Sequence, residues 1–500
     1  MLSTAQMIKL LDPKNQNLPN IKLEAPSRKY PRVNVMVFQG DEKEVGKQFM
    51  ELKKATFEGK KKKITEVVGN KMVYWCHGLG EKEKMTPRQI RRFFGKTYLA
   101  SLSGNPKTVV IHCPPQWVKW AAVGVHVAAL NPALFKKESP KEKAPTVILV
   151  HPEFKSASAQ VKKQLNQGMN VAEGKNLMRM LGAFSPNNLN PSTYSEIIKK
   201  LAKQWKVSVK QCTRNELKKY ELLNAVSLGS KHDSQLMVLT LNPPKGKTKN
   251  STVVVGKGLC FDSGGIQVKP GTYMNNMKQD MAGSASLLGT LHTLVSNKQA
   301  VKQTTHFLLP LAENMSGENA TRPDDIWTTG DGQQVEILHT DAEGRLVMAD
   351  ALCYAKNNFK NANRFVTIAT LTGSCVMALG DVYTGVICND EPLSQKVVEL
   401  GKESGDLMHP APWDMEFDDL NTPMADVGNL GENSREAGWI KGGLFLNRFV
   451  PKPKKDSEKI EFCHLDIAGS IDMDQKGKAW RKKGLSSGIA VGFLAELLTK

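Results

Sequence analysis

The chain has 500 residues, more than one hydrophobic core usually organises, so we expect two domains. Its 40% hydrophobic and 24% charged residues are typical of a globular protein and exclude a disordered or fibrous chain, and the lack of any run of about 18 apolar residues excludes a transmembrane helix. The net charge of +20 fits a phosphate-rich partner, an anionic surface or a lysine-rich exterior, and charge alone does not choose among them.

Apolar, β-rich runs alternate with helical patterns along residues 1–157, and this alternation predicts a smaller N-terminal α/β domain. We expect strands at 33–38, 72–75, 109–113 and 146–151, and helices at 87–102 and 116–130. The lysine run at 60–63 has no interleaved aromatic residues on which bases could stack, so we expect a solvated surface there and no nucleic-acid partner.

A helical pattern over residues 158–184 predicts a connecting helix, which the following Ser-Pro-Asn-Asn sequence ends. Residues 185–500 resume the alternation and predict a larger C-terminal α/β domain with a mixed, helix-covered sheet. We expect its strands at 252–261, 305–312, 364–371, 383–389 and 460–467, and its helices at 284–296, 346–357 and 393–403.

The eight cysteines lie far apart in the chain, with no C-x-x-C pair and no zinc-finger spacing. They are typical of reduced, mostly buried thiols in an intracellular protein. The N-terminal residues lack the apolar stretch of a signal peptide, so both the cytoplasm and the mitochondrial matrix stay open as locations.

The first chemically informative segment, residues 256–265, has the sequence Gly-Lys-Gly-Leu-Cys-Phe-Asp-Ser-Gly-Gly and follows an apolar strand pattern. Lys257 and Asp262 lie within it, and Lys269 and Asp280 follow. In open α/β sheets ligands collect at the carboxyl ends of strands, which makes this turn a candidate binding site. Taken alone, however, residues 262–265 are better explained as a tight turn in which glycines supply positive φ.

A second segment, residues 339–346, has the sequence His-Thr-Asp-Ala-Glu-Gly-Arg-Leu and leads into a helical pattern. If residues 339–343 are extended, Asp341 and Glu343 point to the same side, with Arg345 beside them at a helix N-terminus. A helix cap would explain one of these carboxylates. It would not explain two with an adjacent arginine, so we expect both carboxylates to share a pocket.

Four carboxylates, from Asp262, Asp280, Asp341 and Glu343, are thus expected in apolar surroundings, where they repel one another unless cations hold them. Divalent metals are the economical explanation, and several carboxylates can bridge two ions about 3.5–4 Å apart, as in two-metal hydrolases. No H-E-x-x-H sequence occurs, which excludes a single-zinc protease helix. Oxygen-rich ligation suits Mn²⁺, Mg²⁺ or Zn²⁺.

These two segments resemble the signature motifs of the leucyl aminopeptidase (cytosol aminopeptidase) family, whose second motif is usually N-T-D-A-E-G-R-L. The resemblance covers nearly the whole second domain and is weak in the N-terminal part. Other family-like segments lie at 313–315, 371–373, 425–429 and 464–469. The resemblance implies a metal-dependent aminopeptidase that releases leucine-like N-terminal residues from peptides, with residues 185–500 as its catalytic two-metal domain.

Residue by residue, the resemblance implies two divalent ions, Zn²⁺ or Mn²⁺, with Mg²⁺ as a further candidate. The ligands of one ion would be Lys257, Asp262, Asp280 and Glu343, and those of the other Asp262, Asp341 and Glu343. By the same resemblance, Lys269 polarises the scissile carbonyl and Arg345 holds a bicarbonate ion as general base. The pocket for the N-terminal side chain would be lined by Met277, Thr370, Gly373, Ala468 and Ile471. The family also implies a homohexamer.

The sequence departs from the family pattern at four places: His339 replaces Asn, Met-Ser-Gly-Glu at 315–318 replaces Met-Pro-Ser-Gly, and Asp324 and Ser487 replace Gly. Such drift around an intact ligand set, in a basic chain, is similar to the sperm-specific leucyl aminopeptidases of insects. The alternative function is therefore a structural or storage protein that keeps the fold and the oligomer while catalysis is weakened. We expect His339→Asn to raise peptidase activity or to broaden its pH range toward acid. The alternative is that His339 packs passively and leaves the metal geometry unaffected.

Overall fold

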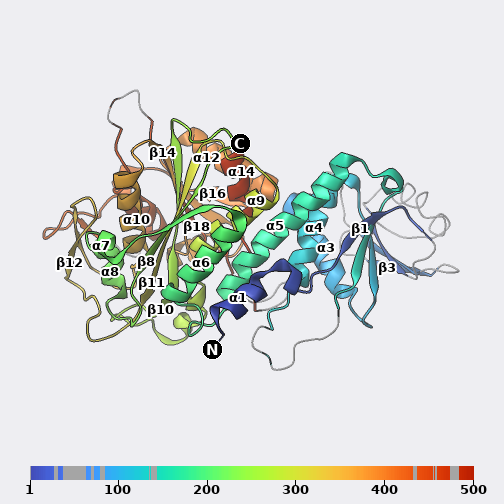
Figure 1. Cartoon of the computed structure of the whole chain (residues 1–500), viewed down its shortest axis with the longest axis horizontal. Helices are drawn as coiled ribbons and strands as arrows, with labels where there is room; N and C mark the ends of the chain where they lie inside the picture. The colour runs from blue at the N-terminus through green and yellow to red at the C-terminus, as the bar shows by residue number, and fades with distance from the viewer. Residues whose placement is uncertain are drawn as a thin grey trace. The chain divides into compact units, whose positions relative to one another are not determined.

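The computed structural model describes residues 2–27, 32–37, 64–68, 73–78, 85–133, 136, 143–431, 436–453, 455, 459–472 and 484–500. The lysine run at 60–63 lies outside these residues. The described chain forms two compact units, one over residues 12–173 and the other over residues 2–11, 174–472 and 484–500 (Figure 1). Their boundary falls inside helix α5 (Ala159–Ala183), and the division at 157 and 184 expected from the sequence stays a prediction.

The unit over residues 12–173 is built on a sheet whose described strands have the order β1-β6-β5-β2-β4-β3. These strands are β1 (Ile21–Glu24), β2 (Arg32–Val37), β3 (Ile64–Val68), β4 (Val73–Gly78), β5 (Thr108–His112) and β6 (Thr146–Val150). Neighbours pair in parallel except β3 and β4. Helices α3 (Pro87–Ala100) and α4 (Val118–Ala129) share a buried core with this sheet that includes Phe94, Ile111 and Val125.

The second unit is built on a larger sheet with the described order β16-β15-β18-β14-β9-β11-β8-β7, and β10 pairs with β11 outside this row. These strands are β7 (Ser208–Gln211), β8 (Gln235–Leu241), β9 (Ser251–Gly256), β10 (Gly258–Asp262), β11 (Thr304–Asn314), β14 (Ala362–Ala369), β15 (Thr384–Cys388), β16 (Met408–Pro410) and β18 (Glu461–Asp466). Strands β18, β14, β9 and β11 are parallel, whereas β8 runs antiparallel to β11 and β15 antiparallel to β18. The mixed, helix-covered α/β fold expected from the sequence is confirmed.

Helices cover both faces of this sheet because its central strands are apolar on both sides. The main helices of the unit are α1 (Thr4–Leu11), α6 (Pro191–Trp205), α8 (Glu221–Ser227), α9 (Ala282–Ser296), α10 (Gly344–Asn358), α11 (Gly373–Leu379), α12 (Glu391–Ser404), α13 (Gly438–Asn447) and α14 (Val491–Thr499). On one face, Val253 and Val255 join a buried cluster with residues of α8, α10 and α13. On the other, α9 contacts β9, and Val254 is fully buried (Figure 1). Each such side chain contributes roughly 1.5–3 kcal/mol on burial.

The structure corrects the single strand expected over residues 252–261, because two strands, β9 and β10, lie there with a break at Lys257. The segments of β7, β8, α6 and α14 also form regular structure, although the sequence patterns predict no element in them. A small sheet of β12 (Ile326–Thr328), β13 (Gln334–Glu336) and β17 (Val427–Gly428) was likewise unexpected. None of the described helices is both long enough and apolar enough to cross a membrane.

Candidate metal centre

Lys257 occupies the break between β9 and β10. Its N–H donates to the carbonyl of Ile368 at 3.0 Å, and its own carbonyl accepts the N–H of Ser284 at 2.8 Å. The backbone is thus held from both sides, and the side chain is only 4% exposed. A buried ammonium group needs anionic partners, so the position of Lys257 requires carboxylates around it.

The turn after β10 positions Asp262 and Lys269. Gly264 and Gly265 have φ of +91° and +69°, a conformation that residues with side chains rarely adopt. The N–H of Gly264 donates to Asp262 Oδ1 at 2.9 Å, and the N–H of Lys269 donates to the carbonyl of Ser263 at 2.9 Å. The tight turn predicted from the glycines therefore also fixes a candidate ligand and brings Lys269 back toward it.

Asp280 directly follows a short 3₁₀ turn (Met277–Gln279) and lies two residues before α9. Thr370 Oγ1 donates to Asp280 Oδ1 at 2.6 Å, which leaves the second carboxylate oxygen for Lys257. The loop after β14 thus orients Asp280 across 90 residues of sequence.

The segment 339–343 is not extended, which corrects the expectation from the sequence. Thr340 and Asp341 form a turn in which the N–H of Ala342 donates to the carbonyl of His339 at 3.2 Å. The turn is stabilised because His339 Nδ1 accepts the N–H of Asp341 at 3.1 Å. Helix α10 begins directly after Glu343, so Arg345 lies in its first turn as expected.

Lys257 makes close ion pairs with two of the carboxylates. Its Nζ lies 2.8 Å from Asp280 Oδ2 and 2.9 Å from Glu343 Oε1, and it also donates to the carbonyl of Thr370 at 3.2 Å. Burial disfavours the charge on Lys257, but Asp280 and Glu343 outweigh it and hold the pKa of the ammonium above its ordinary value. The lysine is therefore protonated while it pairs with these carboxylates.

Lys269 pairs with the other two carboxylates. Its Nζ lies 2.7 Å from Asp262 Oδ2 and 2.6 Å from Asp341 Oδ1. The carboxyl groups crowd one another, and burial together with the charge of Asp262 raises the pKa of Glu343 to about 8. Burial and Asp262 also raise the pKa of Asp341. The four acidic groups outnumber the two lysines that neutralise them.

The donor atoms of the cluster fit a divalent cation. One oxygen each from Asp262, Asp341 and Glu343 lie within 4.8 Å of one another. Glu343 Oε2 is buried, and no described residue forms a hydrogen bond with it. Oxygen donors that converge in this way, with an unsatisfied buried carboxylate oxygen among them, suit Mn²⁺, Mg²⁺ or Zn²⁺.

Asn429 organises the cluster from outside and was missed as a functional residue by sequence reasoning. Its Oδ1 accepts the N–H groups of Leu338 and His339 at 2.7 and 3.1 Å, and its Nδ2 donates to the carbonyl of His339 at 2.7 Å. Its own carbonyl accepts Arg345 Nη1 at 2.8 Å. Asn429 is fully buried, so one side chain holds both the ligand turn and the guanidinium. The only signal in the sequence was its place in a family-like segment.

Asn314 is a second missed residue, at the carboxyl end of β11. Its Nδ2 donates to Asp262 Oδ1 at 2.8 Å and to the carbonyl of Thr340 at 3.0 Å. It therefore joins the two motif segments, and it too appeared in the sequence only within a family-like segment.

The five residues expected to line the substrate pocket lie on three segments of the chain, and of these Thr370 contacts the cluster through Asp280. Asp466 links two of these segments, because its carboxylate accepts Thr372 Oγ1 at 2.7 Å and the N–H of Ala468 at 3.0 Å. Gly373 is exposed, whereas Ile471 is 1% exposed. Met277 belongs to the turn that ends at Asp280.

A family model described as "Cytosol aminopeptidase family, catalytic domain" matches residues 176–495, more than half of the chain. The chain belongs to the cytosol aminopeptidase family. A probable cytosol aminopeptidase of Aromatoleum aromaticum is 38% identical over 367 residues, which cover 72% of this chain and 68% of that relative. The chain is accordingly a metalloaminopeptidase of the leucyl aminopeptidase type, as the sequence motifs predicted.

Two solved structures are similar to this chain over most of its length. A bottromycin maturation enzyme in complex with Mn has a TM-score of 0.78 and 25% identity, and the match covers 94% of this chain and 99% of that one. A mutant of the tomato leucine aminopeptidase has a TM-score of 0.81 at 23% identity, covering 96% and 97%. The second likeness shows that the fold is shared.

The departures from the cytosol aminopeptidase pattern have distinct structural settings. His339 Nδ1 occupies the place in which an asparagine Oδ1 would accept the same N–H two residues later, so the ligand turn keeps its hydrogen bond. Asp324 has φ of +73°, which explains why glycine would be favoured there. Ser487 Oγ donates to the carbonyl of Ser470 at 2.7 Å.

Proposed function

We propose that this aminopeptidase uses two divalent cations to remove leucine-like N-terminal residues from peptides. The cations would be held by Lys257, Asp262, Asp280, Asp341 and Glu343, the set named from the family resemblance. Zn²⁺ and Mn²⁺ suit these donors, with Mg²⁺ as a further candidate. The likeness to an enzyme in complex with Mn supports a divalent ion of this kind.

The observation that carries the proposal is the convergence of oxygens from Asp262, Asp341 and Glu343 within 4.8 Å, with Glu343 Oε2 buried and unsatisfied among the described residues. Such an arrangement is unfavourable for a merely structural cluster, because like charges in a buried site repel. When bound, the ions supply an activated water at neutral pH and polarise the scissile carbonyl.

The two lysines have different tasks. Lys257 contacts Asp280 and Glu343, and as a ligand of a cation it would be neutral, its Nζ proton having passed to solvent. Lys269, whose Nζ lies 2.7 Å from Asp262 Oδ2 and 2.6 Å from Asp341 Oδ1, would polarise the scissile carbonyl, as the family resemblance implies.

Arg345 acts as an anion holder. Its Nη1 is fixed on the carbonyl of Asn429, and its guanidinium lies 5.8 Å above the ring of Phe445, so the group has one orientation. Burial lowers the pKa of Arg345 to about 10, and it is still charged at neutral pH. We assign to it the binding of a bicarbonate ion that accepts the proton of the attacking water.

Specificity for leucine-like residues would come from the apolar set Met277, Thr370, Gly373, Ala468 and Ile471. Peptides are the substrates, and a homohexamer is the assembly that the family resemblance implies. We place the protein inside the cell, in the cytoplasm or in mitochondria, and the name of the relatives supports the intracellular part of this proposal. The storage-protein alternative gains no support from the site, since the ligand turn is intact despite His339.

The test is hydrolysis of a leucine amide with added Mn²⁺ or Zn²⁺, run beside an Asp341→Asn variant. We expect metal-dependent hydrolysis by the native protein and a loss of at least about 100-fold in the variant, together with weaker metal binding measured by calorimetry. A native protein that binds the ions but leaves the amide intact would contradict the proposed function. Equal rates for both proteins would show that Asp341 is not a ligand.

A further inference from the structure

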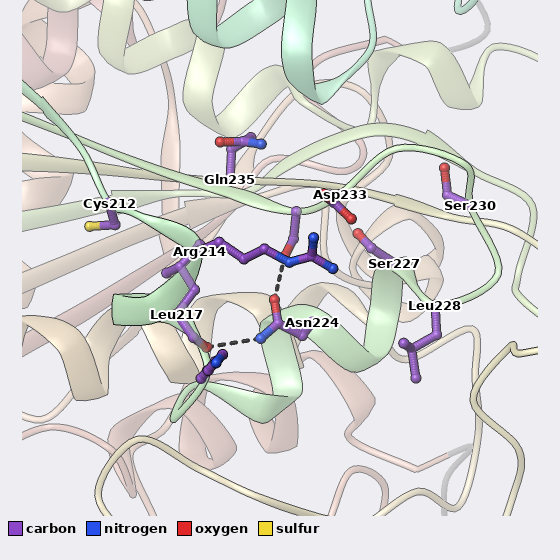
Figure 2. A pocket seen from close by; sticks show the side chains of 11 residues that line it. Cys212, Arg214, Leu217, Asn224, Ser227, Leu228, Ser230, Asp233 and Gln235 are labelled. Carbon is purple, nitrogen blue, oxygen red and sulfur yellow. Dashed lines mark hydrogen bonds between the residues drawn. The ribbon is translucent and has the colours of Figure 1, made fainter.

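A cavity of about 430 Å³ lies at the edge of the second unit, between β7, α8, the start of β8 and the short helix α7 (Arg214–Leu217) (Figure 2). No residue of the carboxylate cluster lines it. Its floor is buried, since Cys212 and Leu217 are 3% and 4% exposed. Leu228, which is 41% exposed, adds an apolar side chain at its mouth.

The charged side chains around this cavity carry both signs. Arg214, Lys218 and Asp233 line it and are exposed, and none of them forms an ion pair with any described residue. In Figure 2 the guanidinium of Arg214 and the carboxylate of Asp233 turn toward the same part of the cavity. A guanidinium recognises a carboxylate, and an aspartate recognises an ammonium group, so the two together match a zwitterion.

An unsatisfied hydroxyl group lies beside these charges. Ser227 lines the cavity, is 6% exposed, and its Oγ has no hydrogen-bond partner among the described residues. A buried hydroxyl without a partner costs roughly 1–3 kcal/mol.

The cavity is connected to the carboxylate cluster through two hydrogen bonds made by neighbouring residues of β11. Ser230, which lines the cavity, donates from Oγ to Glu313 Oε2 at 2.7 Å. The next residue on β11 is Asn314, whose Nδ2 donates to Asp262 Oδ1 at 2.8 Å. The loop of Ser230 also packs tightly, because a Cβ on Gly229 would lie 1.9 Å from the carbonyl oxygen of Met315. A shift of this loop therefore reaches the residue that orients a metal ligand.

We propose that this cavity binds a free α-amino acid with an apolar side chain, and that its occupancy alters turnover through Ser230, Glu313 and Asn314. Arg214 and Lys218 bind the carboxylate, Asp233 binds the ammonium group, and Leu217 and Leu228 contact the side chain. Such an amino acid is the class of product that an aminopeptidase releases. The binding half of the proposal is independent of the proposed function, and the coupling half rests on it.

Binding is tested by equilibrium dialysis of labelled L-leucine against the Mn²⁺-loaded protein. Arg214→Gln and Asp233→Asn each remove one pole of the site, and Lys231→Gln changes an exposed neighbour that does not line the cavity. We expect each of the first two variants to raise the Kd for leucine at one class of sites, the cavity, at least about tenfold, because a charged hydrogen bond contributes about 1.5–3 kcal/mol. The control and the leucine bound at the active centre should be unchanged.

Competitors define the ligand class. 3-Methylbutylamine, which an aminopeptidase cannot hydrolyse, lacks the carboxylate and 4-methylpentanoate lacks the ammonium group, so neither should displace leucine from this class of sites. If inorganic phosphate displaces it and Asp233→Asn tightens phosphate binding, the cavity is a plain anion site and the zwitterion assignment is wrong. Unchanged leucine binding in both Arg214→Gln and Asp233→Asn would show that the cavity does not bind leucine.

Coupling is tested by the effect of L-leucine on kcat for a leucine amide substrate, since competition at the active centre changes KM alone. Ser230→Ala should keep the binding of leucine in the cavity and lose the change in kcat. If leucine fills the cavity and kcat of the native enzyme stays constant, the coupling half is overturned while the binding half stands.

Discussion

Gly344 is the residue through which the geometry of the carboxylate cluster is most easily perturbed without touching a ligand. A Cβ at this position would lie 2.4 Å from Lys257 Cε and 2.5 Å from its Nζ. Non-bonded carbon atoms are in contact at about 3.5–4.0 Å, so in Gly344→Ala the Lys257 side chain must move by about 1 Å or more. Its Nζ is held at 2.8 and 2.9 Å from Asp280 and Glu343, and a shift of that size breaks at least one of these contacts.

The expected result is a loss of function without a loss of fold. A misplacement of about 1 Å in a catalytic site can cost about 100-fold, so we expect kcat/KM to fall by that order and Mn²⁺ to bind about tenfold more weakly. The melting temperature should change little, because alanine is about 1 kcal/mol more favourable than glycine in a helix and offsets part of the local strain. Leucine amide kinetics, calorimetric Mn²⁺ titration and thermal unfolding measure the three quantities.

Gly182→Ala is the matched control. It is the same substitution in a helix of the same unit, but its Cβ would meet Gln279 Cγ at 3.5 Å, an ordinary contact. Activity should therefore be retained there. If Gly344→Ala also keeps native kcat/KM and Mn²⁺ affinity, the position of Lys257 does not matter to the site and the ligand role given to it is wrong.

Three further predictions concern the surroundings of the site and the stability of the second unit. His339→Asn should keep metal affinity and activity at or above the native level, since the asparagine side chain can accept the same N–H of Asp341. His339→Ala cannot accept it and should lose at least about threefold in kcat/KM. Equal kcat/KM values for the two variants would show that this hydrogen bond does not matter to activity. Lys175→Met should lower the free energy of unfolding, measured by urea titration, by about 3–5 kcal/mol, because it leaves Asp406 buried and without the ammonium group 3.0 Å away. The double variant Lys175→Met, Asp406→Leu should recover much of this loss. Burial raises the pKa of Asp350 to about 7, although the backbone N–H groups that it accepts act in the opposite direction. The native fold therefore binds this proton more tightly than the unfolded chain does, and the free energy of unfolding should fall as pH rises from about 4 to 7. Asp350→Asn should flatten this pH dependence, and an unchanged pH dependence would refute the role given to Asp350.

The local parts of the site could be predicted from the sequence, because short segments encode them. The turn at Gly264 and Gly265 follows from residue type, and the entry of Arg345 into a helix follows from the pattern after it. The break at Lys257 could not be predicted, since an apolar run with one lysine is compatible with a continuous strand until Ile368 and Ser284 bind its backbone.

Long-range contacts account for what sequence reasoning missed. Residues 339–343 form a turn instead of an extended segment partly because Asn429, ninety residues later, binds the N–H and the carbonyl of His339. The role of Asn314 depends in the same way on its contact with Asp262 across 52 residues. No periodicity or local propensity contains such information, so only the folded chain reveals it.

The parallel centre of the large sheet has a consequence for how this protein is made. Strand β9 pairs with β14, so that Val253 lies opposite Phe365, and β14 pairs in turn with β18, so that Ala369 lies opposite Asp466. Pairings between residues so distant in sequence form slowly, because a long loop must close before the contact stabilises it. A chain emerging from the ribosome therefore leaves one edge of the apolar strand β14 unpaired until β18, which ends at Asp466, is available. We expect chaperone dependence to be highest in that interval and proteolytic fragments that end before β18 to be inactive.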